Sequence, residues 1–149
     1  QEVQLLRGHL RDNLRISTHE FTDEALMEAL DFAGLGEFVR AHPEGLDLKV
    51  QDGGGGLSTG QKVAVELAKL YLQDPAVVLM DEPTAALDQQ AESEFINRFG
   101  RWLGDRTCVM ATHRTAFLSQ MHQIALLKDG ALVAIGPRDA MLEKLRGPS

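Results

Sequence analysis

The sequence has a single cysteine, fewer basic than acidic residues, and no long apolar run. Cys108 lies in the apolar run 107–111, so we expect a small buried side chain and a reducing compartment rather than a disulfide. The formal net charge of -7 disfavours direct binding to nucleic acid or to anionic lipid, which attract clustered lysine and arginine. No stretch approaches the roughly 20 apolar residues that cross a bilayer, and residues 1–6 lack a signal-peptide pattern. We therefore expect the chain itself to be soluble.

The first part of the chain is predicted to be helical. At 149 residues, 44% hydrophobic and 25% charged, the chain has the size and composition of one globular unit. Thr22 has the features of a helix cap ahead of an apolar face that ends at Gly34. A shorter helix is expected over 37–41. The glycine tract 53–56 predicts a loop that is either mobile or closely approached by another segment.

The second part alternates between strand and helix patterns, which is typical of an α/β fold. The apolar run 76–80 predicts a strand buried on both faces of a parallel sheet. Asp129-Gly130 predicts a two-residue hairpin turn, and Pro137 is expected to start a last helix that runs through Leu145. The other predicted elements are a helix over 90–103, a strand over 107–112, a short helix near 115–119 and a strand over 123–127.

Two acidic residues and a histidine follow consecutive predicted strands. Asp81 and Glu82 come directly after the strand over 76–80, and His113 follows the strand over 107–112. In open α/β sheets, ligands bind in the crevice beyond the carboxyl ends of the strands. One carboxylate there can face a hard cation such as Mg²⁺ and the other a water that attacks a phosphate, while the imidazole can donate to a phosphate oxygen. Taken singly, each residue is more simply explained as part of a polar turn at a strand end.

Ser58 opens a predicted helix. Ser58-Thr59-Gly60-Gln61 has the spacing of a capping box, and the apolar-rich stretch 63–72 follows. A helix N-terminus offers free backbone N–H groups and the positive end of the helix dipole to an anion. A plain helix cap accounts for the same residues, so both interpretations stay open.

The order and spacing of these motifs resemble the ATP-binding domain of the ABC transporter family over essentially the whole chain. Each motif alone is moderately specific, whereas the ordered set is very specific. Residues 4–14 are similar to the segment after the Q-loop in ABC exporters, and residues 42–52 resemble peptide and protein exporters of the type I secretion kind. The matching motifs are Gln1 for the Q-loop glutamine, Leu57-Ser58-Thr59-Gly60-Gln61 for the LSGGQ signature, Val77 to Glu82 for the Walker B strand with its catalytic glutamate, Ala86-Leu87-Asp88 for the D-loop, and Ala111-Thr112-His113-Arg114 for the switch-histidine loop.

The resemblance implies an α/β fold that comprises part of a P-loop NTPase core, with a parallel sheet and flanking helices, and the helical subdomain of the family. Residues 1–74 would form the Q-loop and helical signature subdomain, and residues 75–149 the α/β half of the core. The chain would belong to the ATP-hydrolysing subunit of an exporter at the cytoplasmic face of the plasma (inner) membrane, with ATP and Mg²⁺ as cofactors. Its partners would be the transmembrane domain of the exporter and a second ATPase domain in a head-to-tail dimer.

The resemblance also implies roles for individual residues. Asp81 and Gln1 would lie near the metal. Glu82 would act on the attacking water, and His113 would steady the γ-phosphate. The remaining implied contacts to the nucleotide come from Ser58, Gly60 and Gln61 of a second copy and from Asp88 of the D-loop.

Several features depart from the family pattern. Thr59 replaces the first glycine of the signature pair and adds a side chain near the expected γ-phosphate. The glycine tract 53–56 replaces the bulkier charged residues that precede the signature in many exporters. The G-x-x-x-x-G-K-[ST] motif does not occur in the 149 residues, so no P-loop amides or lysine cradle the phosphates. We therefore expect the chain alone to be inactive in ATP hydrolysis.

Two further expectations follow from these departures. Because the chain begins at Gln1 without an initiator methionine, we expect it to be a piece of a longer protein. The missing P-loop strand lies within the sheet in the family, so its absence should leave a sheet edge and apolar area uncovered. Self-association of the chain would be the response.

Two other function classes stay open. A non-catalytic interaction module, whose helical residues 22–72 dock on a membrane partner, is favoured by Thr59 and by the absent P-loop. A soluble ABC ATPase that acts on DNA or ribosomes is disfavoured by the exporter-like segments and the acidic charge. The sequence preceding Gln1 would separate these readings, and the transported substrate would be recognised by membrane segments rather than by these residues.

Overall fold

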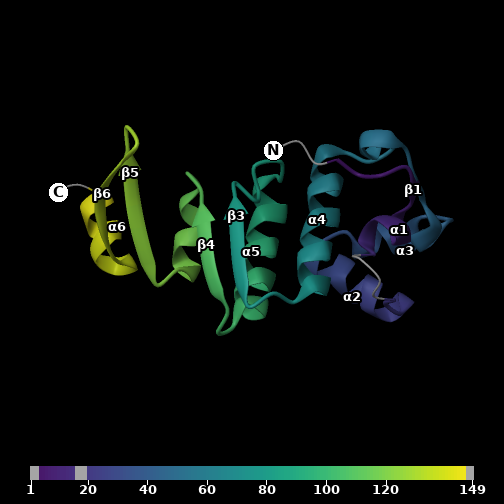
Figure 1. Ribbon diagram of the computed structural model, residues 1–149, viewed down its shortest axis with the longest axis horizontal. Helices are drawn as coiled ribbons and strands as arrows, with labels where there is room; N and C mark the ends of the chain where they lie inside the picture. The colour runs from purple at the N-terminus through teal and green to yellow at the C-terminus, as the bar shows by residue number, and fades with distance from the viewer. Residues whose placement is uncertain (1–3, 16–19, 147–149) are drawn as a thin grey trace. The chain divides into compact units, whose positions relative to one another are not determined.

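The computed structural model describes residues 4–15 and 20–146, which fall into two compact units. The first unit runs to Ala111 and the second begins at Thr112. None of the helices in the described ranges is long and apolar enough to cross a bilayer. The first unit contains β1 (Gly8–His9), α1 (Leu10–Leu14), α2 (Asp23–Ala33), α3 (Gly36–Ala41), η1 (Gly45–Asp47), β2 (Lys49–Val50), η2 (Asp52–Gly54), α4 (Thr59–Gln73), β3 (Val77–Asp81), α5 (Gln89–Leu103) and β4 (Thr107–Ala111) (Figure 1). The second unit contains η3 (Thr115–Gln120), β5 (Gln123–Lys128), β6 (Ala131–Pro137) and α6 (Arg138–Arg146).

The predicted helix after Thr22 is confirmed as α2. The Thr22 hydroxyl accepts a hydrogen bond from the Ala25 N–H at 3.3 Å, which satisfies one of the free donors of the first turn. The helix ends at Gly34, whose φ of 82° is the left-handed conformation of a helix C-terminus. Its buried face, which includes Leu26 and Leu30, lies on the side of the helix that packs against α4. α2 and α4 pack against each other and form the helical part of the first unit.

An aromatic cluster joins α2, α4 and α5. The ring centroid of Phe32 on α2 lies 4.9 Å from that of Tyr71 on α4 and 5.6 Å from that of Phe95 on α5. Phe95 and Phe99 are fully buried, and Trp102 lies 5.8 Å from Phe99. Tilted and edge-on ring pairs at such separations stabilise the fold beyond the apolar area that they bury. The helical part and α5 therefore share one core.

β3 and β4 are parallel neighbours, with Val78 paired to Cys108 (Figure 1). Their side chains alternate between faces, so that Val78 is 1% exposed and Leu79 is 75% exposed. The prediction that the strand over 76–80 is buried on both faces is therefore wrong, because the side chains of this two-stranded sheet are packed on one face only. Val109 is also exposed on the open face, which agrees with the uncovered apolar area expected from the sequence. Burial raises the pKa of the Cys108 thiol, which keeps the side chain neutral.

The second unit contains the predicted hairpin. β5 and β6 are antiparallel, and Lys128 pairs with Ala131 across the turn. Asp129 and Gly130 have φ values of 49° and 77°, and positive φ at both central residues is the requirement of the hairpin turn that this dipeptide favours. α6 packs against the hairpin through Met141, which is 2% exposed.

The glycine tract is closely approached by a lysine side chain. Gly53, Gly54 and Gly56 have φ values of 67°, 78° and 95°, which side chains with a Cβ rarely adopt. The Lys62 Nζ donates to the Gly53 carbonyl oxygen at 2.7 Å. An added Cβ at Gly54 would lie 2.8 Å from the Lys62 Cε. Of the two predicted alternatives, the closely approached loop is therefore the one that the structure supports.

Arg11 of α1 bridges two segments of the first unit. Its Nη1 lies 2.7 Å from Asp23 Oδ1 at the start of α2, and its Nε lies 2.5 Å from Asp47 Oδ1 in η1. The hydrogen bond from the Arg11 guanidinium lowers the pKa of Asp23 below its ordinary value of 3.8. A lowered carboxyl pKa in the folded state stabilises the protein above the ordinary pKa, and this contribution is lost as the pH falls through the folded pKa.

Replacing Arg11 by methionine is expected to flatten the acid end of the stability curve. In the unchanged chain, the free energy of unfolding should fall as the pH is lowered below about 3.8, because Asp23 becomes protonated. In the Arg11→Met variant this part of the fall should be smaller, since the paired cation is gone. Urea unfolding at about pH 6 and at about pH 3 gives, for each protein, the fall in the free energy of unfolding between the two pH values. Arg7→Met, which alters an exposed arginine outside this bridge, serves as the control. An equal fall in the free energy of unfolding in all three proteins would contradict the prediction.

Candidate functional site

The carboxyl ends of β3 and β4 lie side by side, and the two predicted acidic residues stand at the end of β3. Asp81 ends β3 and pairs with Ala111, the last residue of β4. The Glu82 N–H then donates to the Ala111 carbonyl oxygen at 2.9 Å, which ties the residue after β3 to the end of its neighbour. Parallel register thus places both carboxyl groups at the edge where α/β sheets bind ligands.

Glu82 has an unusual backbone conformation. Its φ is 44°, in the left-handed region that residues with a Cβ seldom occupy. Such a conformation is unfavourable by about 1–3 kcal/mol and persists where the surrounding structure imposes it. Asp81 is exposed, and Glu82 is partly exposed. Both residues are therefore reached by solvent at this edge of the sheet.

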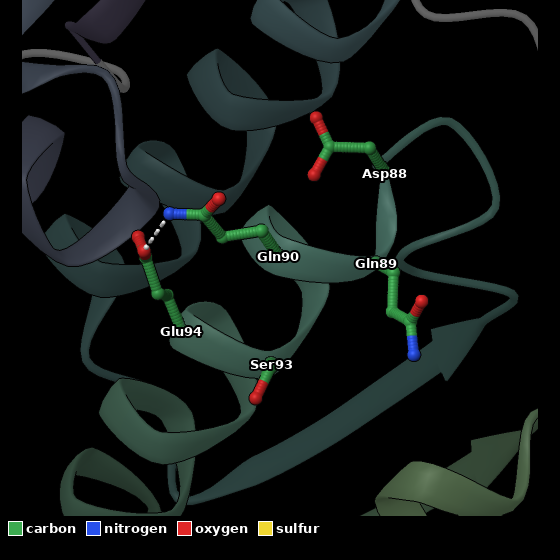
Figure 2. Close-up of a pocket in the computed structure, with 5 residues that line it drawn as sticks. All are labelled: Asp88, Gln89, Gln90, Ser93 and Glu94. Carbon is green, nitrogen blue, oxygen red and sulfur yellow. Dashed lines mark hydrogen bonds between the residues drawn. The ribbon is translucent and has the colours of Figure 1, made fainter.

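Asp88 closes the loop from β3 and caps α5. Its Oδ1 accepts a hydrogen bond from the Ala91 N–H at 2.9 Å. An open hollow of about 580 Å³ lies over the first turns of α5. Figure 2 shows its lining, with the hydrogen bond from the Gln90 amide to the Glu94 carboxylate at 3.1 Å. The capping role explains why an aspartate stands at 88, and its predicted contact to a nucleotide stays a prediction.

Ser58 caps α4 in the way that its spacing predicts. The Gln61 N–H donates to Ser58 Oγ at 3.2 Å, and the Ser58 N–H donates to Gln61 Oε1 at 2.8 Å, which completes a capping box. Ser58 and Thr59 are exposed. The Thr59 side chain, absent from the family pattern, therefore stands at an accessible helix N-terminus.

Replacing Ser58 by alanine is expected to lower the free energy of unfolding by about 1 kcal/mol, because the Gln61 N–H loses its acceptor. Urea unfolding at neutral pH measures the change. Ser93→Ala, on the exposed side of α5, removes a hydroxyl that caps nothing and should change stability by less than about 0.5 kcal/mol. Equal effects in the two variants would contradict the capping role.

The signature segment lies next to the D-loop segment within the first unit. A Cβ added at Gly60 would meet the Ala86 carbonyl oxygen at 3.4 Å and the Leu87 Cδ2 at 3.7 Å. A pocket of about 220 Å³ lies at this junction and is lined by Ser58, Gly60, Gln61 and Leu87, together with residues of α2 and α5. The fold therefore brings together the predicted signature residues and the segment before Asp88.

The other two predicted site residues are not among the described residues of the first unit. His113 follows Ala111 by two residues, belongs to the second unit and is exposed. Its approach to Glu82 stays a prediction. Gln1 lies outside the described residues.

Three residues at this site were not identified from the sequence. Thr84 and Glu92 form a buried hydrogen bond between the loop and α5. Arg98 lines the pocket at the signature, and its Nε donates to the Phe32 carbonyl oxygen at 2.8 Å near the end of α2. A signal for Glu92 is present in the sequence, because it stands three residues before Phe95 on the apolar face of α5.

Three structural features agree with the motif order in the sequence. They are the acidic residues at the edge of parallel strands, the short loop that leads to a capped helix, and the second capped helix beside that loop. The sequence profile described as ABC transporter matches residues 1–85. The chain belongs to the ABC transporter family. Its mixed α/β fold is that of the ATP-binding domain of an ABC exporter.

The relatives of this ABC transporter chain are much longer than the chain. It is 36% identical to the ABC-type transporter fsqE of Aspergillus fumigatus, over 97% of this chain and 11% of that protein. It is 29% identical to the putative multidrug export ATP-binding/permease protein YgaD of Bacillus subtilis, over 96% of this chain and 25% of that protein. A solved bacterial Atm1-family ABC exporter with ATP bound is similar with a TM-score of 0.84 and 25% identity, over 97% of this chain and 25% of that chain. The chain thus spans from about a tenth to a quarter of these relatives.

Proposed function

We propose that this chain is part of the ATP-binding and ATP-hydrolysing unit of an ABC exporter and powers transport across a membrane. The observation that carries the proposal is the position of Asp81 and Glu82 at the carboxyl edge of two parallel strands, held by the hydrogen bond from Glu82 to Ala111. Membership of the ABC transporter family and the likeness to exporters support it. As in the family, ATP and Mg²⁺ are the proposed cofactors.

The proposed mechanism assigns one role to each acidic residue. Asp81 is an exposed carboxylate at the strand edge, and Mg²⁺ is usually held in NTPases by one or two carboxylates, waters and substrate phosphates, so this donor fits the ion. Magnesium there would neutralise the charge on the phosphate oxygens. Glu82 orients the attacking water and accepts its proton, and His113 donates to the γ-phosphate. Gln1 is proposed as a further group near the metal.

The proposed partner of this half-site is a second ATPase domain in a head-to-tail dimer. The exposed Ser58 and its neighbours Gly60 and Gln61 would close over the nucleotide of the other copy, with Asp88 contributing from the D-loop. Most of the rate enhancement in such a reaction comes from positioning and charge stabilisation, so all members must be present together. The whole assembly would lie at the cytoplasmic face of the plasma (inner) membrane, docked on a transmembrane domain.

The kind of exporter is the finer part of the proposal. Residues 42–52 resemble the corresponding segment of exporters of the type I secretion kind. On that similarity we propose that the exporter is of this kind.

The test compares phosphate release from Mg-ATP by the 149-residue chain and by the intact exporter in lipid nanodiscs. The chain alone should be inactive, because it has no P-loop motif and its net charge of -7 repels a polyanion. The intact exporter should turn over ATP. Turnover by the chain alone that Glu82→Gln abolishes would contradict its inactivity. Absence of turnover in the intact protein would instead favour a non-catalytic interaction module.

Self-association of the isolated chain is proposed as well. Val77, Leu79 and Val109 are 57%, 75% and 59% exposed on the open face of the β3–β4 sheet, and neighbouring exposed apolar side chains favour association in water. Light scattering over a range of concentrations measures the mass. A monomer at the highest concentration would contradict the proposal.

A further inference from the structure

Two buried polar side chains meet where the loop from β3 joins α5. Thr84 is 1% exposed and Glu92 is 8% exposed. The Thr84 hydroxyl donates to Glu92 Oε1 at 2.5 Å in the protein interior. The threonine hydroxyl supplies the proton of this hydrogen bond, and the side-chain oxygen of Glu92 accepts it. A polar side chain is unfavourable in the interior unless it is hydrogen-bonded, so each member of this pair needs the other.

Thr84 lies at the centre of the loop that carries the proposed catalytic acid. The Ala85 N–H donates to the Glu82 carbonyl oxygen at 3.2 Å, and the Leu87 N–H donates to the Thr84 carbonyl oxygen at 3.0 Å. The first turn spans residues 82–85 and encloses Thr84, and the second joins Thr84 to Leu87 near the end of the loop. Thr84 therefore lies within the turn that begins at Glu82, whose φ of 44° needs support from its surroundings.

Glu92 holds its end of the hydrogen bond on a rigid element. Its N–H donates to the Asp88 carbonyl oxygen at 2.9 Å in the first turn of α5. One and two turns further along, the fully buried Phe95 and Phe99 fix the same helix in the aromatic cluster. The loop is thus tied at its centre to a helix that cannot shift without disturbing the core.

We propose that the Thr84–Glu92 hydrogen bond is a positioning element for ATP hydrolysis, which holds the loop so that Glu82 stays directed at the attacking water. The proposal rests on the function proposed above. Thr84 and Glu92 contact neither nucleotide nor water in this role, and they act through Glu82. A misplacement of about 1 Å in a catalytic group can lower a rate by as much as 10²-fold, so a single buried hydrogen bond can control the rate.

The test uses three variants of the intact exporter. Thr84→Val keeps the shape of the side chain and removes the hydroxyl, whereas Thr84→Ser keeps the hydroxyl. Thr84→Val should lower kcat by at least about tenfold and leave KM for Mg-ATP within about twofold, because binding does not depend on the direction of Glu82. Thr84→Ser should restore most of the rate. Val39→Ala, in the buried core of α3, provides a loss of stability remote from the loop.

Comparison with the control separates positioning from mere stability. The proposal requires that the kcat of Thr84→Val is lowered. Val39→Ala, with an equal or larger loss in Tm, should keep the kcat of the unchanged protein. A kcat for Thr84→Val within about twofold of the unchanged protein would overturn the proposal. So would a parallel fall of kcat and Tm in both variants.

Hydrogen–deuterium exchange of residues 82–88 gives a second readout that does not need activity. Thr84→Val should speed exchange of the Ala85 and Leu87 amides by about tenfold, and neither Thr84→Ser nor Val39→Ala should do so. Unchanged exchange in Thr84→Val would overturn the proposal. If the intact protein shows no ATP turnover, or if Glu82→Gln keeps it, the proposed function fails, and the exchange result alone then decides whether the hydrogen bond holds the loop.

Discussion

Replacing Glu82 by glutamine in the intact exporter is expected to lower the rate of ATP hydrolysis by about 10²–10⁴-fold, because a general base contributes about this much. Glutamine keeps the size of the side chain but cannot accept the proton of the attacking water. The backbone hydrogen bond from residue 82 to the Ala111 carbonyl oxygen should persist, so the edge of the sheet should keep its geometry. Nucleotide affinity should therefore change little, and the loss should appear in kcat.

Phosphate release under saturating Mg-ATP and equilibrium binding of labelled ATP measure the two quantities separately. The matched control is Glu143→Gln, which makes the same chemical change on an exposed glutamate of α6 and should leave the rate unchanged. Hydrolysis by Glu82→Gln within about tenfold of the unchanged protein would show that another group activates the water. An equal loss of ATP binding would instead assign Glu82 to the nucleotide site itself.

Replacing Phe95 by alanine is expected to lower the free energy of unfolding by about 3–5 kcal/mol. Phe95 is fully buried and lies 5.6 Å from the ring centroids of both Phe32 and Phe99. The substitution leaves a cavity at the junction of α2, α4 and α5, and the neighbouring rings also lose their aromatic contacts. An effect of this size is a large fraction of the stability of a typical domain.

Urea unfolding followed by far-ultraviolet circular dichroism measures the loss, provided that the slope with denaturant stays the same. Leu6→Ala is the control because the Leu6 side chain is 78% exposed, and its loss should stay below about 0.5 kcal/mol. A loss below about 1 kcal/mol for Phe95→Ala would show that the cluster does not hold the helical part to α5.

Local patterns predicted many elements well. The Thr22 cap, the Ser58 capping box and the Asp129-Gly130 turn are all present. Each depends on hydrogen bonds or backbone angles within a few residues, so the residue types alone specify it. The family was also predictable, since the ordered motifs occupy short contiguous segments.

Residue patterns did not predict burial across the β3–β4 sheet. An apolar run has the same residue pattern whether one face of a strand is covered or both. The pattern depends on the side chains of the strand and not on the neighbouring elements. Leu79 is therefore exposed against expectation. In the same way, nothing local to Phe32 shows that its ring meets the rings of Tyr71 and Phe95.

The sequence by itself determined the helix caps, the hairpin turn, the α/β class and membership of the ABC transporter family, because these follow from local hydrogen-bonding preferences and from motif order. Only the tertiary structure decided that the Thr84 hydroxyl reaches Glu92, that Gly60 lies against the Ala86 carbonyl, and that one face of β3 is open. These contacts join segments that meet only when the helices and strands pack together. The physical reason is that burial and the direction of a buried hydrogen bond depend on the surrounding elements, which no single stretch of the chain specifies.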